Sequence, residues 1–427
     1  MAAAPSSSAA PEARSLGLWS LLALGINGIV GVGIFFVPNQ IAGLVPGPWG
    51  VFAYLLTLLA LLPVSLCYAK LGARFDRDGG PYLWACAAFG ERAGFVVGFA
   101  SYASAVLSTA AVLTGLGDYT AKVLGFGAHS RLFSSAAAAL FGAVVAAGLR
   151  PSAWVWSALT VAKLVPLVLL VTVFLVGRHG AGVSAAPAGT LPWGRAVLLL
   201  VFPMQGFEIV PVPGSHVRSP ARVIPIATVG SLVLSAGLYA LLHWACVSAL
   251  GTLALADADA PLIAAGGVLG GALLAGLISA GSNVSAIGIG FGMVAMTPRY
   301  LSALEARSDS ALGALLAEET AQQVPRRALF VTLALVVALV AAGELGRLFE
   351  MSSVAVLFQY SVSVLALAVL AFRRQHLLTR WDALWALLAL GTLALVARAV
   401  ERAELLVLGG IIAVGLLLGF VRKRRGA

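Results

Sequence analysis

The sequence predicts an all-α protein that crosses a membrane many times, and three observations lead to this prediction. Of the 427 residues, 60% are hydrophobic and only 10% are charged, whereas soluble proteins carry about 25% charged residues. The mean hydropathy is +1.00. Long apolar stretches follow one another along most of the chain, separated by short segments with charges, proline or glycine. This pattern excludes a soluble globule, a disordered chain and a coiled coil.

Twelve apolar stretches are long enough for membrane-spanning helices, each of which needs about 20 residues. They cover residues 16–44, 49–70, 92–125, 131–149, 153–176, 195–215, 222–251, 265–297, 326–343, 350–372, 380–399 and 403–421. The first stretch is too long for the core of a cleavable signal peptide. We therefore expect one transmembrane domain over residues 16–421, with a cytoplasmic tail at 1–15 and a basic cytoplasmic tail at 422–427.

The positive charges are consistent with this arrangement. If both termini are cytoplasmic, the inner loops hold 19 of the 27 Lys and Arg residues and the outer loops hold seven. Such an excess on the inner side is typical of membrane proteins and agrees with an even number of spans. It also explains the net charge of +10, so we expect membrane lipid, and no nucleic acid, as the partner of these charges.

Residues for catalysis or metal binding are not arranged in recognisable patterns. The three cysteines and five histidines lack the spacing of a disulfide framework or a metal site, so we expect no metal and no other cofactor. His-Glu-x-x-His, Gly-x-Ser-x-Gly and Walker motifs are absent from the sequence, so an enzyme is not expected. His243, within the seventh predicted span, is interpreted as a core histidine with satisfied hydrogen bonds.

Two predicted spans contain residues that interrupt helices. The first has four glycines between residues 25 and 33 and reaches Pro38, and the sixth contains Pro203 and Gly206. Glycine and proline unwind helices, and unwound backbone at membrane depth survives only where it lines a cavity or is buried in protein. Two interrupted spans at corresponding positions indicate a transporter built from inverted repeats. The alternative is a packing face of small residues.

Five motifs, in order, resemble those of amino acid permeases of the amino acid–polyamine–organocation superfamily. They are residues 31–38 (GVGIFFVP), 67–82 (with CYAKL and GGPY), 163–167 (KLVPL), 206–208 with 217–225 (GFE and VRSPARVIP), and 297–300 with 324–325 (TPRY and VP). The resemblance implies the leucine-transporter fold. That fold has two inverted repeats of five helices, here about 16–176 and 195–372, and two further helices at about 380–421.

The resemblance and the physics of a broken helix together predict a site for a zwitterionic amino acid. The half-helix that starts near Gly33 offers free N–H groups and a positive dipole end, and the half that ends near Ile29 offers free carbonyls. We expect the substrate carboxylate on the amides of Val32 and Gly33. We expect its ammonium group on the carbonyls of Ile29, Phe202 and Gln205.

The residue types around this site favour neutral amino acids. Gly31, Gly33 and Gly206 allow a ligand to approach the backbone, whereas Val32 stands where the resembling permeases often have Ser or Ala. The pocket residues are mostly apolar or uncharged. Two roles are open for Phe202, namely a gate over the substrate or a side chain of the core.

Lys163 lies in the middle of the fifth predicted span, where an ammonium group costs about 3 kcal/mol even on the lenient insertion scale. In the resembling permeases a lysine here is proposed to take the place of a coupling sodium ion. The resemblance therefore implies proton coupling through Lys163, next to an ion-like site formed by Gly28, Ser279, Ser282 and Asn283. The alternative is a lysine that extends to the membrane interface.

Glu208 is the second charged residue expected at membrane depth. Two roles are open for it: a proton carrier, or a structural acceptor that closes the unwound sixth span.

Together these features predict a secondary active transporter of amino acids, driven by protons through alternating access. An exchanger of amino acids or amines, a polyamine transporter and a sensor that does not transport are the alternatives. Arginine greatly outnumbers lysine, and Ala, Gly and Leu dominate. This usage indicates a bacterium with GC-rich coding, hence a multi-pass protein of the inner membrane.

Overall fold

The computed structural model describes residues 16–75, 80–123, 125, 129–148, 153–177, 190–212, 217–305, 311–322 and 324–421. Within these ranges the regular structure is helical, apart from one isolated β-bridge between Leu16 and Val217. The all-α class predicted from the sequence is therefore confirmed. The two predicted tails, residues 1–15 and 422–427, lie outside the described residues.

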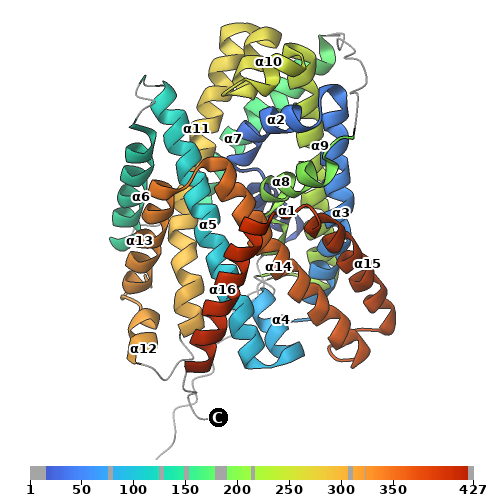
Figure 1. Cartoon of the computed structure of the whole chain (residues 1–427), viewed down its shortest axis with the longest axis vertical. Helices are drawn as coiled ribbons and strands as arrows, with labels where there is room; N and C mark the ends of the chain where they lie inside the picture. The colour runs from blue at the N-terminus through green and yellow to red at the C-terminus, as the bar shows by residue number, and fades with distance from the viewer. Residues whose placement is uncertain are drawn as a thin grey trace, which may run out of the picture.

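The helices follow one another along the chain with short connections (Figure 1). They are α1 (Leu18–Ile29), α2 (Gly33–Leu44), η1 (Gly47–Trp49), α3 (Gly50–Gly72), α4 (Gly80–Phe89), α5 (Glu91–Val123), α6 (Ser130–Ala146), α7 (Ala153–Val176), α8 (Trp193–Met204), η3 (Phe207–Ile209), α9 (Pro220–Leu250), α10 (Thr252–Ala256), α11 (Pro261–Glu305), α12 (Ala311–Ala317), α13 (Arg326–Ala342), α14 (Leu345–Phe372), α15 (Arg380–Ala397) and α16 (Arg402–Val421).

Eight of the described helices are long and apolar enough to cross a membrane, and a ninth span is formed if the bent pair α1 and α2 counts as one. The chain is thus a polytopic membrane protein. Each of the twelve predicted ranges contains helix, but α6, α8 and the 17-residue α13 are not among the helices long and apolar enough to cross a membrane. The twelve-span count and the two inverted repeats stay predictions.

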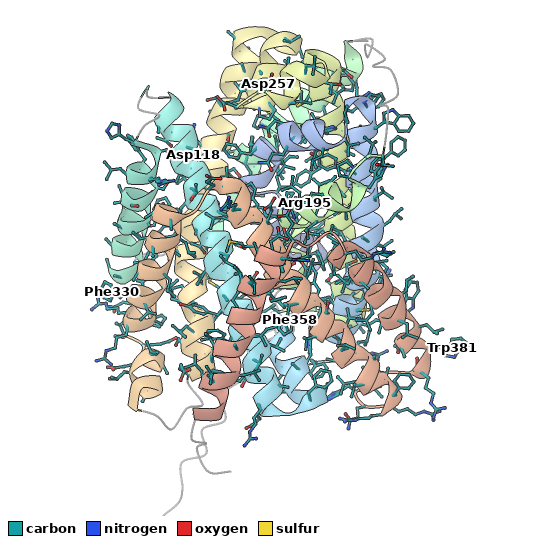
Figure 2. The ribbon with its side chains drawn as sticks, in the orientation of Figure 1. Asp118, Arg195, Asp257, Phe330, Phe358 and Trp381 are labelled. Carbon is teal, nitrogen blue, oxygen red and sulfur yellow. The ribbon has the colours of Figure 1, made fainter. Side chains whose placement is uncertain are left out.

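The surface of the bundle carries large apolar side chains, as expected for contact with lipid. Phe330 and Trp381 extend outward from the bundle (Figure 2), and 62% and 77% of their surfaces are exposed. Soluble proteins rarely expose continuous surfaces of this kind. The buried core instead contains many small residues and hydroxyls. Ser108 of α5, for example, is hydrogen bonded to Ser352 of α14 at 2.6 Å.

Two elements differ from the sequence prediction. The eighth span was expected at 265–297, but helical geometry breaks at Gly270 and Gly271, where Gly271 has a φ of 68°. The part of α11 before this break lies with α10 at one end of the bundle (Figure 1). In addition, α4 occupies a segment that was expected to be a loop between spans, and it lies at the opposite end.

Ion pairs link the last two helices to the rest of the bundle. Lys70 at the end of α3 contacts Asp382 in the first turn of α15 at 2.5 Å. Arg195 at the start of α8 contacts Glu350 of α14 at 2.5 Å and Glu404 of α16 at 2.8 Å. The Lys70 ammonium group is thus paired with an opposite charge.

Asp382→Ala should lower the thermal stability of the protein. Asp382 accepts hydrogen bonds from the backbone N–H and the hydroxyl of Thr379, at 2.8 and 2.9 Å, in a capping box at the start of α15. Loss of such a cap reduces the free energy of unfolding by about 1–2 kcal/mol. The measurement is the midpoint of thermal unfolding in detergent. Glu344→Ala is the control, because the Glu344–Arg347 pair is largely exposed and contributes about 0–1 kcal/mol. An equal shift for both variants would contradict the prediction.

Candidate functional site

The break between α1 and α2 is the centre of the candidate site. Residues 30–32 are not helical, and the two half-helices are bent by 52° relative to one another. The break therefore frees carbonyls at the end of α1 and N–H groups at the start of α2. Val30 retains a hydrogen bond from its N–H to the Ile26 carbonyl at 2.8 Å. The interruption that the glycines of the first span predicted is present.

Lys163 of α7 reaches the freed carbonyls of α1. Its Nζ donates to the Asn27 carbonyl oxygen at 2.9 Å and to the Val30 carbonyl oxygen at 2.6 Å. The side chain is buried, with 2% of the residue exposed, so it does not extend to the interface. An ammonium group at the C-terminal end of a helix is favoured by the negative end of the helix dipole. The structure thus places Lys163 against the first break. The two carbonyls that it contacts flank the Gly28–Ile29 pair.

The Ile29 carbonyl lies between the Asn27 and Val30 carbonyls in the chain. It accepts a hydrogen bond from a tyrosine that the sequence analysis missed. The Tyr239 hydroxyl of α9 donates to the Ile29 carbonyl oxygen at 2.8 Å, and the backbone amide of Gly31 faces the same hydroxyl. Ile29 was expected to bind the substrate ammonium, and its carbonyl already has this one partner. A carbonyl oxygen has two lone pairs, so a second donor is still possible there. A single tyrosine in an apolar span gave no signal in the sequence.

The second break lies directly against the first. Gly206 has a φ of 122° between α8 and η3. A Cβ on Gly206 would lie 2.4 Å from the carbonyl carbon of Gly28, and one on Gly28 would lie 3.2 Å from the Gly206 carbonyl oxygen. Gly206 therefore has no room for a side chain, and a side chain on Gly28 would crowd the Gly206 backbone. The structure therefore brings together Gly28 and Gly206, which the sequence had placed in different parts of the site.

The first turn of α2 is enclosed by α8 and α5. A Cβ on Gly33 would lie 2.9 Å from the Pro203 ring. Val32 is buried, and its side chain points toward Gly115 of α5. The amides expected to bind a carboxylate thus belong to a backbone segment held between α8 and α5. Ile289 of α11 lies against Gly31.

Phe202 and Gln205 have different surroundings. The Phe202 ring stacks on Phe349 of α14 with ring centroids 4.2 Å apart, so it packs in the core in this conformation. The side-chain nitrogen of Gln205 is buried without a hydrogen-bond partner. Of the two, Gln205 is the residue with an unused donor at the second break.

Glu208 lies at the second break and accepts two hydrogen bonds there. One of its carboxylate oxygens accepts the backbone N–H of Gly206 at 2.7 Å and the Tyr360 hydroxyl at 3.0 Å. Tyr360 of α14 lies edge-on to Tyr68 of α3, which is hydrogen bonded to Ser363 at 2.9 Å. These contacts support the structural role for Glu208, one of the two roles that the sequence left open.

The helix α11 packs along α7 on either side of the level of Lys163. Gly281 packs against Pro166 of α7 and Gly288 against Leu159, so α7 and α11 run antiparallel and Lys163 is level with residues 284 and 285. Ser285 is buried, and its hydroxyl is without a hydrogen-bond partner. Ser285 is thus a buried, unpaired hydroxyl of α11 near the level of Lys163, although no described contact joins the two side chains.

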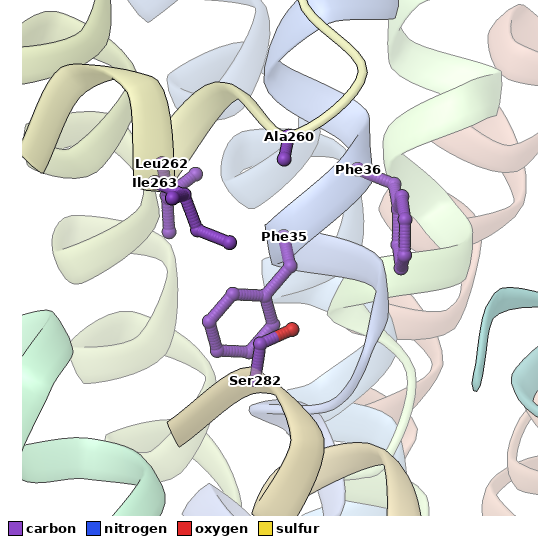
Figure 3. Close-up of a pocket in the computed structure, with 6 residues that line it drawn as sticks. All are labelled: Phe35, Phe36, Ala260, Leu262, Ile263 and Ser282. Atoms are coloured by element: carbon purple, nitrogen blue, oxygen red, sulfur yellow. The ribbon is translucent and has the colours of Figure 1, made fainter. Parts of the chain in front are cut away.

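The α11 residues predicted from the sequence are distributed differently. Asn283 donates its side-chain N–H to the Ser279 carbonyl at 3.1 Å, a bond within one helix. Ser282 is buried and lines a small apolar pocket with Phe35 and Phe36 of α2. Figure 3 shows the Phe35 ring between Ser282 and the segment that joins α10 to α11. The structure thus brings Ser282 to α2, whereas no described contact joins Asn283 to Lys163.

Comparison with known proteins identifies relatives over most of the chain. Residues 16–416 match the family model described as amino acid permease. An uncharacterized transporter of Mycobacterium tuberculosis is 30% identical over 363 residues, which are 82% of this chain and 79% of the relative. A serine/threonine exchanger of Bacillus subtilis is 25% identical over 69% of this chain and 68% of the relative. Cationic amino acid transporter 4 of Mus musculus is 27% identical over 53% of this chain and 40% of the relative.

Gly206→Ala should separate the two breaks and abolish transport. The new Cβ would overlap the Gly28 backbone, and alanine is strained at a φ of 122°, which costs about 1–3 kcal/mol on its own. Thermal unfolding in detergent and uptake by reconstituted protein measure the effect. Gly237→Ala is the matched control, because a Cβ there meets no atom within 4 Å. Normal uptake by Gly206→Ala would show that the contact is dispensable.

Proposed function

The chain belongs to the amino acid permease family, and from that premise we propose that it is a secondary active transporter of neutral amino acids. It carries them across the cytoplasmic membrane by alternating access, in symport with protons. Residues 16–421 form the transporter domain, both termini are cytoplasmic, and the membrane is the inner membrane of a bacterium. The contact of Lys163 with the Asn27 and Val30 carbonyls is the observation that carries this proposal.

We attribute proton coupling to the link that the Lys163 ammonium group makes between α7 and the end of α1. As a cation it donates to two carbonyls of α1 and so ties α7 to the end of that half-helix. A neutral amine gives up the charge-assisted part of these bonds, which contributes about 1.5–3 kcal/mol for a bond to a charged group. Binding and release of one proton therefore changes how firmly the cytoplasmic half of the first span is held. Such a difference between two states is what coupled transport requires.

The proposed substrate site uses the backbone groups around the two breaks. The amides of Val32 and Gly33 bind the carboxylate, and the carbonyls of Ile29, Phe202 and Gln205 bind the ammonium. Support for neutral substrates comes from Glu208, because its hydrogen bonds to Gly206 and Tyr360 leave it engaged in the fold. The name of the Bacillus subtilis relative, a serine/threonine exchanger, points to neutral amino acids, whereas that of the mouse relative points to cationic ones.

Contacts on both sides of the breaks are consistent with a closed state in an alternating-access cycle. The backbone N–H of Arg218 donates to the Leu16 carbonyl at 2.9 Å, which joins the segment before α1 to the segment before α9. At the other end, Asn39 of α2 donates to the Ala258 carbonyl at 3.0 Å, next to α10. In the proposed cycle these two connections open in turn.

Lys163→Ala should uncouple uptake from the proton gradient. The protein is reconstituted into lipid vesicles, and uptake of labelled L-serine, L-leucine and L-lysine is measured with an inward proton or sodium gradient. We expect the wild type to accumulate serine or leucine with protons. The variant should lose about 90% of the proton-driven rate, as expected when a proton-transfer group worth at least tenfold is removed. Counterflow between equal inner and outer pools should continue. Arg347→Ala, which removes a largely exposed positive charge outside the site, is the control.

Three other results of this experiment would contradict the proposal. Accumulation driven by sodium would indicate a sodium symporter. Flux only against a preloaded amino acid would indicate an exchanger, the second candidate, which the name of the Bacillus subtilis relative favours. Flux of lysine alone would indicate a cationic substrate.

Glu208→Gln separates the two roles of this residue. A glutamine oxygen can accept the same two hydrogen bonds from Gly206 and Tyr360, so the break stays closed while the carboxylate is removed. A structural role predicts proton-driven uptake within about twofold of the wild type, whereas loss of a proton carrier costs about tenfold or more. Glu208→Ala, which removes both hydrogen bonds, should impair folding in either case. We expect the structural result.

A further inference from the structure

Polar groups without a partner occur both inside the bundle and on its surface. Inside, both ring nitrogens of His243 are buried without a hydrogen-bond partner, so the sequence prediction of a core histidine with satisfied hydrogen bonds is wrong. On the surface, by contrast, such groups are accessible to ligands, and those at the connection between α14 and α15 are positively charged.

The connection between α14 and α15 lies at a membrane surface. It comprises residues 373–379 and joins two helices that are each long and apolar enough to cross a membrane. It belongs to the same end of the bundle as α4 (Figure 1), and the Arg373 guanidinium group donates to the Ala88 carbonyl of α4 at 3.0 Å. In the proposed orientation this is the cytoplasmic end.

Two arginines at this connection keep their charge unpaired. Arg374, and Arg380 in the first turn of α15, are exposed. Within the part of the chain that the structure describes, their guanidinium groups have neither an ion pair nor a hydrogen bond. Asp382 is the one acidic residue between residues 370 and 385, and it is already paired with Lys70. Both positive charges are therefore available to a ligand from outside the chain.

Large apolar side chains flank the two arginines. Phe372, Leu377 and Trp381 are exposed, and Trp381 extends away from the bundle (Figure 2). Lipid chains cover such side chains in a membrane, and aromatic rings gather where these chains meet the headgroups. Arg374 and Arg380 thus lie at the level of the headgroups, among side chains that face lipid.

The backbone of the connection is strained and held in one conformation. Arg374, His376 and Leu377 are left-handed, with φ of 52°, 53° and 57°, and residues other than glycine keep this conformation only where their surroundings determine it. The His376 ring stacks on Phe75 of α3 with centroids 4.2 Å apart, and Arg373 is held to α4. A ligand that binds here therefore does not have to order the chain first.

We propose that Arg374, Leu377, Arg380 and Trp381 bind an anionic phospholipid of the inner leaflet. We call these four residues the α14–α15 lipid site. The two guanidinium groups hold the headgroup phosphate, for which their planar donors are well suited, while Leu377 and Trp381 contact the acyl chains. A zwitterionic lipid also has a phosphate, but the arginines repel its ammonium group. The site therefore selects phospholipids with a net negative charge.

A lipid bound at the α14–α15 lipid site also stabilises the junction of helices around it. Arg373 joins α14 to α4, the stack of His376 on Phe75 joins the connection to α3, and the pair of Lys70 with Asp382 joins α3 to α15. A ligand that binds only the folded arrangement shifts the folding equilibrium toward it. Anionic lipid should therefore raise the temperature of unfolding.

Arg374→Gln and Arg380→Gln test the site in the full chain in detergent micelles. Phosphatidylglycerol or phosphatidylcholine with brominated acyl chains is added, and the quenching of Trp381 fluorescence is taken as the difference between proteins with and without Trp381→Phe. Each arginine variant should bind phosphatidylglycerol about fivefold more weakly, and the double variant about 25-fold. Binding of phosphatidylcholine should stay within about twofold of the wild type. The double variant should also lose the rise in unfolding temperature that phosphatidylglycerol causes.

Arg222→Gln is the matched control. Arg222 is an exposed arginine in the first turn of α9, which begins at the same side of the membrane in the proposed orientation. This variant should bind phosphatidylglycerol near Trp381 within about twofold of the wild type. Inorganic phosphate and glycerol phosphate are added to the wild type as soluble competitors, and neither should displace the lipid at the concentrations at which the lipid binds.

Three results would overturn the α14–α15 lipid site. Equal quenching by both lipids would mean that this surface touches lipid without selecting its charge. An equal loss of binding in Arg222→Gln would indicate a general attraction of the basic surface. Displacement of the lipid by glycerol phosphate would indicate a site for a soluble phosphate compound. Uptake is not measured in this experiment, so the lipid site can fail while the proposed transport holds, and the reverse.

Discussion

Backbone groups released at a break in a membrane helix have no water to bind, so they must find partners within the protein. The two breaks of this chain are arranged around that constraint. Lys163 donates hydrogen bonds to the Asn27 and Val30 carbonyls, and Tyr239 donates to the Ile29 carbonyl. Glu208 accepts a hydrogen bond from the amide of Gly206. Each of these partners is a side chain on an element that lies next to the break. The positions of α7 and α9 around the site are thus fixed by the hydrogen bonds that α1 cannot make within itself.

The same constraint explains why a broken helix is suited to transport. The groups that need partners are the groups that a zwitterionic substrate or a cation would bind, so ligand and protein compete for a small number of carbonyls and amides. Exchange of one partner for another costs little, because a hydrogen bond is replaced and not lost. Glycine at positions 28 and 206 keeps the two breaks in direct backbone contact. A movement of the backbone at one break therefore displaces the backbone at the other.

Much of this arrangement could be predicted from the sequence, and the limit of that prediction has a physical cause. The glycines of the first span and Pro203 with Gly206 mark the breaks, because backbone conformation is encoded locally. Lys163 is conspicuous because a charge in an apolar span needs a partner. Tyr239 and Ser285 are not conspicuous, because a single polar residue in a membrane helix is common. Their roles depend on which face of α9 and α11 meets the break, and only the packed structure determines that.

The charged groups of the bundle follow two different rules. Lys70 with Asp382, and Arg195 with Glu350 and Glu404, pair with opposite charges and fasten α15 and α16 to helices earlier in the chain. In the contacts that the structure gives for Lys163, the partners are backbone carbonyls. A carboxylate partner would hold the ammonium charge permanently, since separating such a buried pair costs about 3–5 kcal/mol. Carbonyl dipoles hold the ammonium in position without a counter-charge, and in the proposed cycle this is what leaves Lys163 free to release its proton.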